Sequence, residues 1–164
     1  MAEQAKRRLL VVLGSGGHTT EMLRLVDLLG PGLEYVYLLE QEDGFSQARI
    51  RIPGPAFRIH QPSRFGDALW LTALKTVRSA LEACVLLARV RPDAIVACGR
   101  GLAVAVCALG RLMGAKVIFI ETAARVRSRS LTGRLVHPFV DLFYVQWEEA
   151  RALYPGSRYA GRLL

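Results

Sequence analysis

Short apolar segments that alternate with helical ones constrain the fold of this chain more than any other feature. The first, residues 7–15 (RRLLVVLGS), is typical of a buried strand, and Gly14 ends it. Strands that are apolar throughout and separated by helices predict a parallel, Rossmann-like α/β sheet with helices on both faces. Further strands are predicted at 34–39, 57–60, 94–97, 116–121, 141–146 and 158–160, and helices at 19–29, 67–90, 102–113 and 148–153. The chain of 164 residues is expected to form a single domain, 1–164.

The helix predicted at 67–90 is amphipathic, and we expect its apolar side to pack against the sheet. Trp70, Lys75 and Arg78 leave an alternative, in which the helix lies at a membrane interface. The segment 41–67, which contains glycines and prolines, is predicted to be a mobile surface segment near a site, or else an ordinary connection. The expected apolar side of the helix consists of Leu71, Leu74, Val77, Leu81, Val85 and Ala88.

The composition excludes several classes of protein and leaves the meaning of the charge open. Hydrophobic residues make up 52% of the chain, which excludes intrinsic disorder and a collagen-like or disulfide-rich fibre. Lysine and arginine number 22 against 14 acidic residues, a net charge of +8, and 19 of the 22 are arginine. Arginine favours an anionic partner, although an arginine-rich codon preference gives the same count. The arginines are scattered with few aromatics between them, so we expect no nucleic acid partner.

The cysteines indicate the redox state of the protein's compartment, and the uncharged stretches indicate its relation to a membrane. Cys84, Cys98 and Cys107 are an odd number in apolar surroundings, which predicts buried thiols in a reducing compartment. The longest stretch without a charged residue or a histidine, between Arg100 and Arg111, has ten residues, whereas a membrane span needs about 20. We therefore expect the chain to be peripheral to any membrane that it meets.

The glycine loop Gly14-Ser15-Gly16-Gly17 is the sharpest local feature, because it joins the first strand to the first helix. Free N–H groups and the helix dipole favour an anion at such a place. The loop is not a dinucleotide fingerprint, because Thr19 occupies the third glycine position, and it lacks the Gly-Lys-Ser/Thr of a P-loop. It therefore predicts a diphosphate site of another kind, or a tight turn without a ligand.

His18 and Glu121 are the candidate catalytic residues. His18 leaves the glycine loop, where it can act as a base or a phosphate donor, or have a structural role only. A second glycine turn, 98–101, and Glu121 follow other strands, and the carboxyl ends of parallel strands share one edge of the sheet. Glu121 can then be a general base or accept a sugar hydroxyl, or it is a charge at a helix N-terminus. Arginines at 125, 127 and 129 can reach a pyrophosphate or an anionic membrane, or form a solvated basic loop.

Six segments together resemble one family, the membrane-adaptor subunit of the UDP-N-acetylglucosamine transferase of asparagine-linked glycosylation. They are GSGGHTTEM at 14–22, IFIET at 118–122 with RV at 125–126, SLTG at 130–133, DLFYVQW at 141–147, YP at 154–155 and YAGRL at 159–163. The resemblance runs over nearly the whole chain. Its specificity comes from the combination of the glycine motif with the Val-Gln-Trp and Tyr-Pro endings.

The resemblance implies a fold and a function. The family is similar to the N-terminal, acceptor-side half of a two-domain GT-B glycosyltransferase, and a separate small subunit binds the donor. The pair adds the second GlcNAc to GlcNAc-diphosphodolichol, with inversion, on the cytosolic face of the endoplasmic reticulum. This chain would recruit the catalytic partner to the membrane, help to bind the lipid acceptor and be inactive alone.

The site implied by this reading uses His18 or Glu121 as the base. It needs no cofactor, and no metal is expected because the chain has no Asp-x-Asp or clustered His/Cys ligands. The acceptor diphosphate would bind Gly14, Ser15, Gly16, Gly17, Thr19 and Arg125.

Two departures from the family pattern keep alternatives open. The family usually has an N-terminal membrane anchor, whereas only eight residues precede the first strand here, so we expect either peripheral attachment by another surface or a shortened form. Arg100 stands in a turn that the family usually builds as Asn-Gly-Pro-Gly. The alternatives are a subunit of a bacterial capsule or exopolysaccharide glycosyltransferase and a non-enzymatic nucleotide-binding module.

Overall fold

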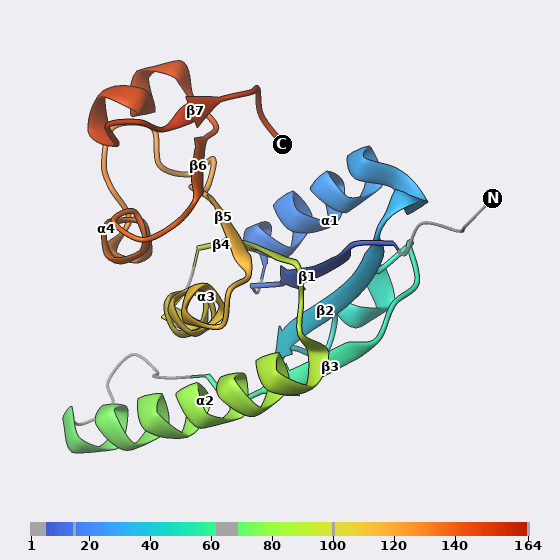
Figure 1. Ribbon diagram of the computed structural model, residues 1–164. Coiled ribbons are helices and arrows are strands. Elements are labelled where there is room, and N and C mark those ends of the chain that lie inside the picture. Colours follow the sequence, from blue (N-terminus) through green and yellow to red (C-terminus); the bar gives the residue numbers. More distant parts are fainter. Residues whose placement is uncertain (1–5, 15, 62–68, 100, 164) are drawn as a thin grey trace.

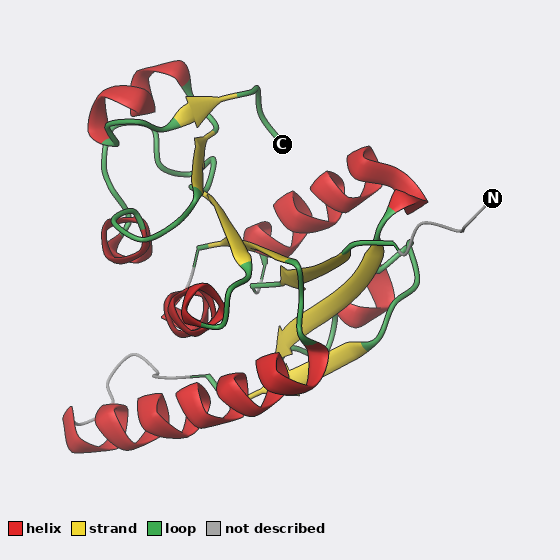
Figure 2. Cartoon of the chain, viewed as in Figure 1, coloured by secondary structure: helices red, strands yellow, loops and turns green. Residues whose placement is uncertain are grey.

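The computed structural model describes residues 6–14, 16–61, 69–99 and 101–163. All seven predicted strands are present, and they form one sheet in the order β3-β2-β1-β4-β5-β6-β7 with every neighbouring pair parallel (Figures 1 and 2). The predicted parallel α/β sheet is confirmed. The strands are β1 (Arg8–Val12), β2 (Glu34–Glu40), β3 (Ala56–Ile59), β4 (Ala94–Cys98), β5 (Lys116–Ile120), β6 (Leu142–Val145) and β7 (Arg158–Tyr159).

The helices follow the predicted pattern with one addition. The 3-10 turn η3 (Glu148–Leu153) replaces the predicted short helix at 148–153. The sequence did not predict α4, six residues whose N-cap Ser130 accepts a hydrogen bond from the Gly133 N–H. The remaining elements are α1 (Gly17–Leu29), η1 (Gly30–Gly32), η2 (Gln47–Arg49), α2 (Leu69–Val90), α3 (Gly101–Leu112) and α4 (Leu131–Val136). The predicted start of α2 at residue 67 lies outside the described residues.

Helices cover both faces of the sheet, as predicted. Side chains of a strand alternate between faces, so β1 directs Leu9 and Val11 to one core and Leu10 to the other. The first core is closed by α1 through Met22 and Val26. The second is closed by α2, α3 and α4, which lie together on the opposite side (Figure 1).

The predicted core side of α2 is wrong. Leu74, Val77, Leu81 and Val85 of that side are exposed to solvent. The helix is apolar on two sides, and the sheet and α3 take the side with smaller residues, where Ser79 and Ala83 permit a close approach. The packed side consists of Ser79, Ala83, Leu86, Leu87 and Val90.

Two further expectations are tested by burial. Cys98 and Cys107 are buried as predicted, but Cys84 is exposed because it lies on the solvent side of α2. In the segment predicted at 41–67, of which residues 41–61 are described, Ser46 is buried and its hydroxyl lies 2.9 Å from that of Thr19 on α1, while 56–59 form β3. No helix among the described residues is both long and apolar enough to cross a membrane.

Candidate functional site

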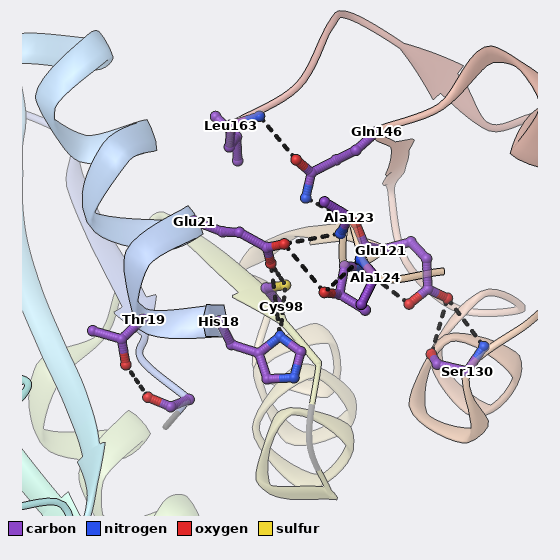
Figure 3. A network of polar contacts seen from close by, with 12 residues as sticks. His18, Thr19, Glu21, Cys98, Glu121, Ala123, Ala124, Ser130, Gln146 and Leu163 are labelled. Atoms are coloured by element: carbon purple, nitrogen blue, oxygen red, sulfur yellow. Dashed lines mark hydrogen bonds and ion pairs between the residues drawn. The ribbon is translucent and has the colours of Figure 1, made fainter. Parts of the chain in front are cut away.

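Three adjacent strands bring the predicted site residues to one edge of the sheet. β1 leads into the glycine loop, β4 into Gly99, and β5 into Glu121. Figure 3 shows the polar side chains that meet there, drawn from α1, the end of β4 and the segment after β5. The common edge expected from the sequence is therefore present.

The glycine loop presents an uncapped helix N-terminus. Gly16 has φ +66°, a left-handed conformation that glycine adopts without strain, and α1 begins at Gly17. Within the described residues no side chain caps the first turn of α1. The N–H groups of that turn and the positive end of the helix dipole therefore remain available to an anion. Ser15, also predicted to bind diphosphate, lies outside the described residues.

The side chain of Thr19 has a structural role. It is fully buried, and its hydroxyl contacts the Gly14 carbonyl oxygen and, at 2.9 Å, the Ser46 hydroxyl. Only its backbone N–H is left for a ligand. Sequence reasoning did not identify Ser46, because it reaches the loop from 27 residues away.

His18 lies against the two glycine turns. A Cβ on Gly99 would approach the imidazole ring to 2.6 Å, and one on Gly14 would meet the His18 Cβ at 2.9 Å. Gly99 also has φ +62°. The second glycine turn thus makes room for the histidine ring, whose side chain is 25% exposed.

Glu21 is the residue of the site that the sequence did not identify as functional. Its carboxylate is buried, with Oε2 3.6 Å from His18 Nδ1 and accepting the Cys98 thiol at 2.8 Å. Oε1 accepts the Thr122 hydroxyl at 3.1 Å and the Ala123 N–H at 2.8 Å. Burial acts to raise the pKa of Glu21, but these hydrogen bonds outweigh it and lower the pKa below its ordinary value of 4.5.

His18, Glu21 and Cys98 are also the one group among the described residues whose donor types suit a metal ion. One ligand atom from each lies within 4.8 Å of the others. Burial, followed by the nearby Glu21 charge, raises the pKa of the Cys98 thiol, which therefore stays protonated and donates to Glu21. The Cys98 sulfur also lies 3.6 Å from His18 Nδ1, so the thiol contacts both other members of the group.

Glu121 is buried within a second network. Oε2 accepts the Ser130 hydroxyl at 2.9 Å and the Tyr154 hydroxyl, and Oε1 accepts the Thr122 N–H at 3.1 Å. Burial and the bond to Glu121 raise the pKa of Tyr154 to about 12. Thr122 therefore joins the Glu21 and Glu121 carboxylates, one through its hydroxyl and the other through its backbone N–H.

The segment after β5 is held by residues near the end of the chain. Gln146 donates from Nε2 to the Glu121 carbonyl oxygen and accepts the Leu163 N–H at 2.8 Å. Trp147 donates from its indole to the Ala123 carbonyl oxygen at 2.7 Å, and the guanidinium of Arg162 lies 4.4 Å from its ring centroid. The Val-Gln-Trp and Gly-Arg motifs thus support the site segment.

The predicted arginine site is at the surface of this segment. Arg125 is exposed and donates to the Ser128 hydroxyl at 3.1 Å. Arg129, which is also exposed, lies with its guanidinium 5.5 Å from the Tyr154 ring centroid.

A parallel seven-stranded sheet with a glycine loop at its carboxyl edge is a Rossmann-like domain, of the kind that forms one half of a GT-B fold. MurG of Acinetobacter baumannii matches this fold with a TM-score of 0.68 at 16% identity, over 96% of this chain and 44% of that chain. The chain thus spans less than half of the length of MurG, and the likeness concerns the fold alone.

The chain belongs to the Alg14 family. The family model described as "Oligosaccharide biosynthesis protein Alg14 like" matches residues 9–163. The UDP-N-acetylglucosamine transferase subunit ALG14 of Homo sapiens is 32% identical over 178 residues, which cover 95% of this chain and 82% of the human protein. The subunit of Schizosaccharomyces pombe is also 32% identical, over 95% of this chain and 83% of its own length.

Proposed function

We propose that this chain is the acceptor-side subunit of a two-chain UDP-GlcNAc transferase. It recruits a donor-binding catalytic subunit to the cytosolic face of the endoplasmic reticulum membrane and helps to bind GlcNAc-diphosphodolichol, to which the second GlcNAc is added. Membership of the Alg14 family supports the subunit role, because the relatives are named as transferase subunits.

The uncapped N-terminus of α1 is the observation that carries the acceptor site. A diphosphate placed at Gly16 and Gly17 would accept N–H groups of the first helical turn and lie at the positive end of the helix dipole. Apart from chain neighbours, no atom of the described residues lies within 4 Å of the Cβ position of either glycine, which leaves room for the approach. Arg125 would add a positive charge from the facing loop.

His18 is the better placed of the two candidate bases. Glu121 is buried with both carboxylate oxygens accepting hydrogen bonds, whereas the His18 side chain is partly exposed beside the glycine loop. In the transfer step the acceptor 4-hydroxyl oxygen bonds to the anomeric carbon of GlcNAc. The bond from that carbon to UDP breaks, and the hydroxyl proton passes to the imidazole. Glu121 holds the segment after β5 in place.

The exposed stripe of α2 suits the membrane surface. Trp70, Leu74, Val77, Leu81 and Val85 are each between 58% and 72% exposed, and they follow one another at helical spacing. Arg78 and Arg89 fall beside this stripe on the helical wheel, where their charges can meet anionic headgroups. A convex apolar helix face with basic flanks is the form taken by interfacial helices.

An apolar groove on the other face of the sheet suits the protein partner. It runs beside α1 over the sheet residues Ile118 and Tyr144 to the C-terminal Leu163. A groove is concave and accepts a protein segment, whereas a flat lipid surface cannot fill it. We assign the groove to the donor-binding subunit on this ground.

Binding of a water-soluble GlcNAc-diphosphate carrying a short prenyl chain tests the acceptor site. The full chain should bind it in a calorimetric titration, and Gly16→Ala should weaken binding, because alanine at φ +66° distorts the loop. Gly30→Ala, at φ +70° in equally open space at the far end of α1, is the matched control. Tight binding of UDP-GlcNAc without binding of the diphosphate acceptor would instead support a nucleotide-binding module.

A further inference from the structure

We propose that Glu21 is a positioning residue that fixes the proton of His18 on Nδ1 and leaves Nε2 to face the acceptor. The inference rests on the proposed function for the use of His18, but the state of the histidine can be measured without any activity. Glu21 lies on α1, outside the glycine loop itself.

Burial argues against the simplest role of Glu21, a charge that complements the helix dipole. Such a charge works at the solvated surface of the first turn, whereas Glu21 is 1% exposed. A buried carboxylate is costly unless several hydrogen bonds compensate it. Thr122, Ala123 and Cys98 donate three such bonds to it.

These donors fix the direction of the carboxylate. The two bonds to Oε1 come from the segment after β5, and the thiol bond to Oε2 comes from the end of β4. The same Oε2 lies 3.6 Å from His18 Nδ1, on the next turn of its own helix. In Figure 3 this ring nitrogen is directed at Glu21 and Cys98, and the other ring nitrogen lies on the far side of the ring.

Gly14 and Gly99 pack against His18 on the sides away from Glu21. Gly99 lies so close to the imidazole that any Cβ there would overlap it, and Gly14 meets the His18 Cβ. Two groups lie 3.6 Å from Nδ1, Glu21 Oε2 and the Cys98 sulfur, and the thiol proton of Cys98 is already donated to Glu21. The group that Glu21 offers therefore decides which nitrogen of His18 carries the proton. An ionised carboxylate accepts only and therefore favours the Nδ1–H tautomer. Nε2 is then the acceptor that a base needs.

Nitrogen-15 chemical shifts of labelled histidines read the tautomer directly. They are measured on the full chain at about pH 8.5, well above the ordinary histidine pKa of about 6.5. His18→Ala assigns the signal. We expect the wild-type His18 to be protonated on Nδ1, and a wild-type His18 protonated on Nε2 would overturn the proposal whether or not any variant folds.

Glu21→Gln is the test substitution, because it keeps the shape and removes the charge. The amide can donate to Nδ1, so the His18 proton should move to Nε2. Transfer by the assembled two-chain complex should fall on the order of 100-fold or more, as for loss of a general base. An unchanged His18 tautomer in folded Glu21→Gln would overturn the proposal.

A second carboxylate–histidine pair in the chain supplies the control. His60 Nδ1 lies 2.9 Å from Glu82 Oε1, on α2 and away from the glycine loop. Glu82→Gln should leave both the His18 signal and transfer unchanged, and His60 itself should stay protonated on Nδ1, because Arg78 Nη2 donates to its Nε2 at 3.1 Å. If the tautomers behave as expected but His18→Ala retains full transfer, then the catalytic use of His18 in the proposed function is wrong and the positioning contact stands.

Discussion

The thiol of Cys98 donates a hydrogen bond to Oε2 of Glu21 across 2.8 Å, and this bond joins the end of β4 to the first helix. Both groups are buried. The same carboxylate accepts hydrogen bonds from the segment after β5. The Glu21 side chain thus connects α1, the end of β4 and the segment after β5. The stability of the site is therefore expected to depend on Glu21 and its donors.

Cys98→Val should destabilise the chain by about 1–3 kcal/mol, because it removes a donor from a buried carboxylate. Cys98→Ser keeps a hydrogen-bond donor and should therefore lower the free energy of unfolding by less than Cys98→Val does. Urea unfolding gives both values. Cys84→Ser, at an exposed position, is the control and should stay within about 0.5 kcal/mol of wild type. Equal losses for the valine and serine variants would show that the hydrogen bond contributes nothing.

Acid should unfold the chain partly through Glu21. The pKa of Glu21 is lowered in the folded state, so its contribution is fully present above about 4.5 and is lost as the pH falls through the lowered value. Stability measured by urea unfolding should therefore decrease below pH 4.5. Glu21→Gln should be less stable than wild type at pH 7 and should show a shallower decrease in that acid range. Parallel curves for the two proteins would contradict this assignment.

Gly99→Ala should reduce both stability and transfer. Alanine is strained at φ +62°, and its Cβ would overlap the His18 ring. Gly114→Ala is a matched control, because Gly114 has φ +91° and open space around its Cβ position. Backbone strain should lower the free energy of unfolding of both variants by about 1 kcal/mol. Only Gly99→Ala should also impair transfer by the complex, and normal transfer by this variant would argue against a catalytic His18.

Leu81→Ser combined with Val85→Ser should release the chain from anionic vesicles. Burying a leucine or valine side chain contributes about 1.5–3 kcal/mol, so the pair should lower partitioning more than tenfold in a flotation assay. Leu28→Ser is the control, because Leu28 and Leu81 are both 64% exposed but Leu28 lies on α1, on the other face of the sheet. Equal loss for the control, or none for the pair, would remove α2 as the membrane surface.

The sequence predicts the sheet well because each of the strands from β1 to β6 is a short, mostly apolar run between more polar or helical segments. It misjudges α2, since periodicity cannot decide between two apolar sides of one helix. The side that packs is the one with Ser79 and Ala83, which are fully buried, and α2 lies against α3. The six-residue α4 is too short to give a periodic signal.

The candidate site is predicted only in part. The glycine loop, His18 and Glu121 stand out because they follow strands that end at one edge. The contact between His18 and Cys98 joins residues 80 positions apart, and the bond between Glu21 and Ala123 spans 102. Nothing in local spacing indicates such pairs. Only the arrangement of β1, β4 and β5 brings them together.

Transfer of GlcNAc from UDP-GlcNAc to a GlcNAc-diphosphate lipid tests the central claim most directly. The purified chain is assayed alone and again after assembly with a small glycosyltransferase-like subunit, recovered by a pull-down with the chain as bait. The proposed function predicts no transfer by the chain alone and transfer by the pair. Transfer by the chain alone, or none by the assembled pair, would contradict it.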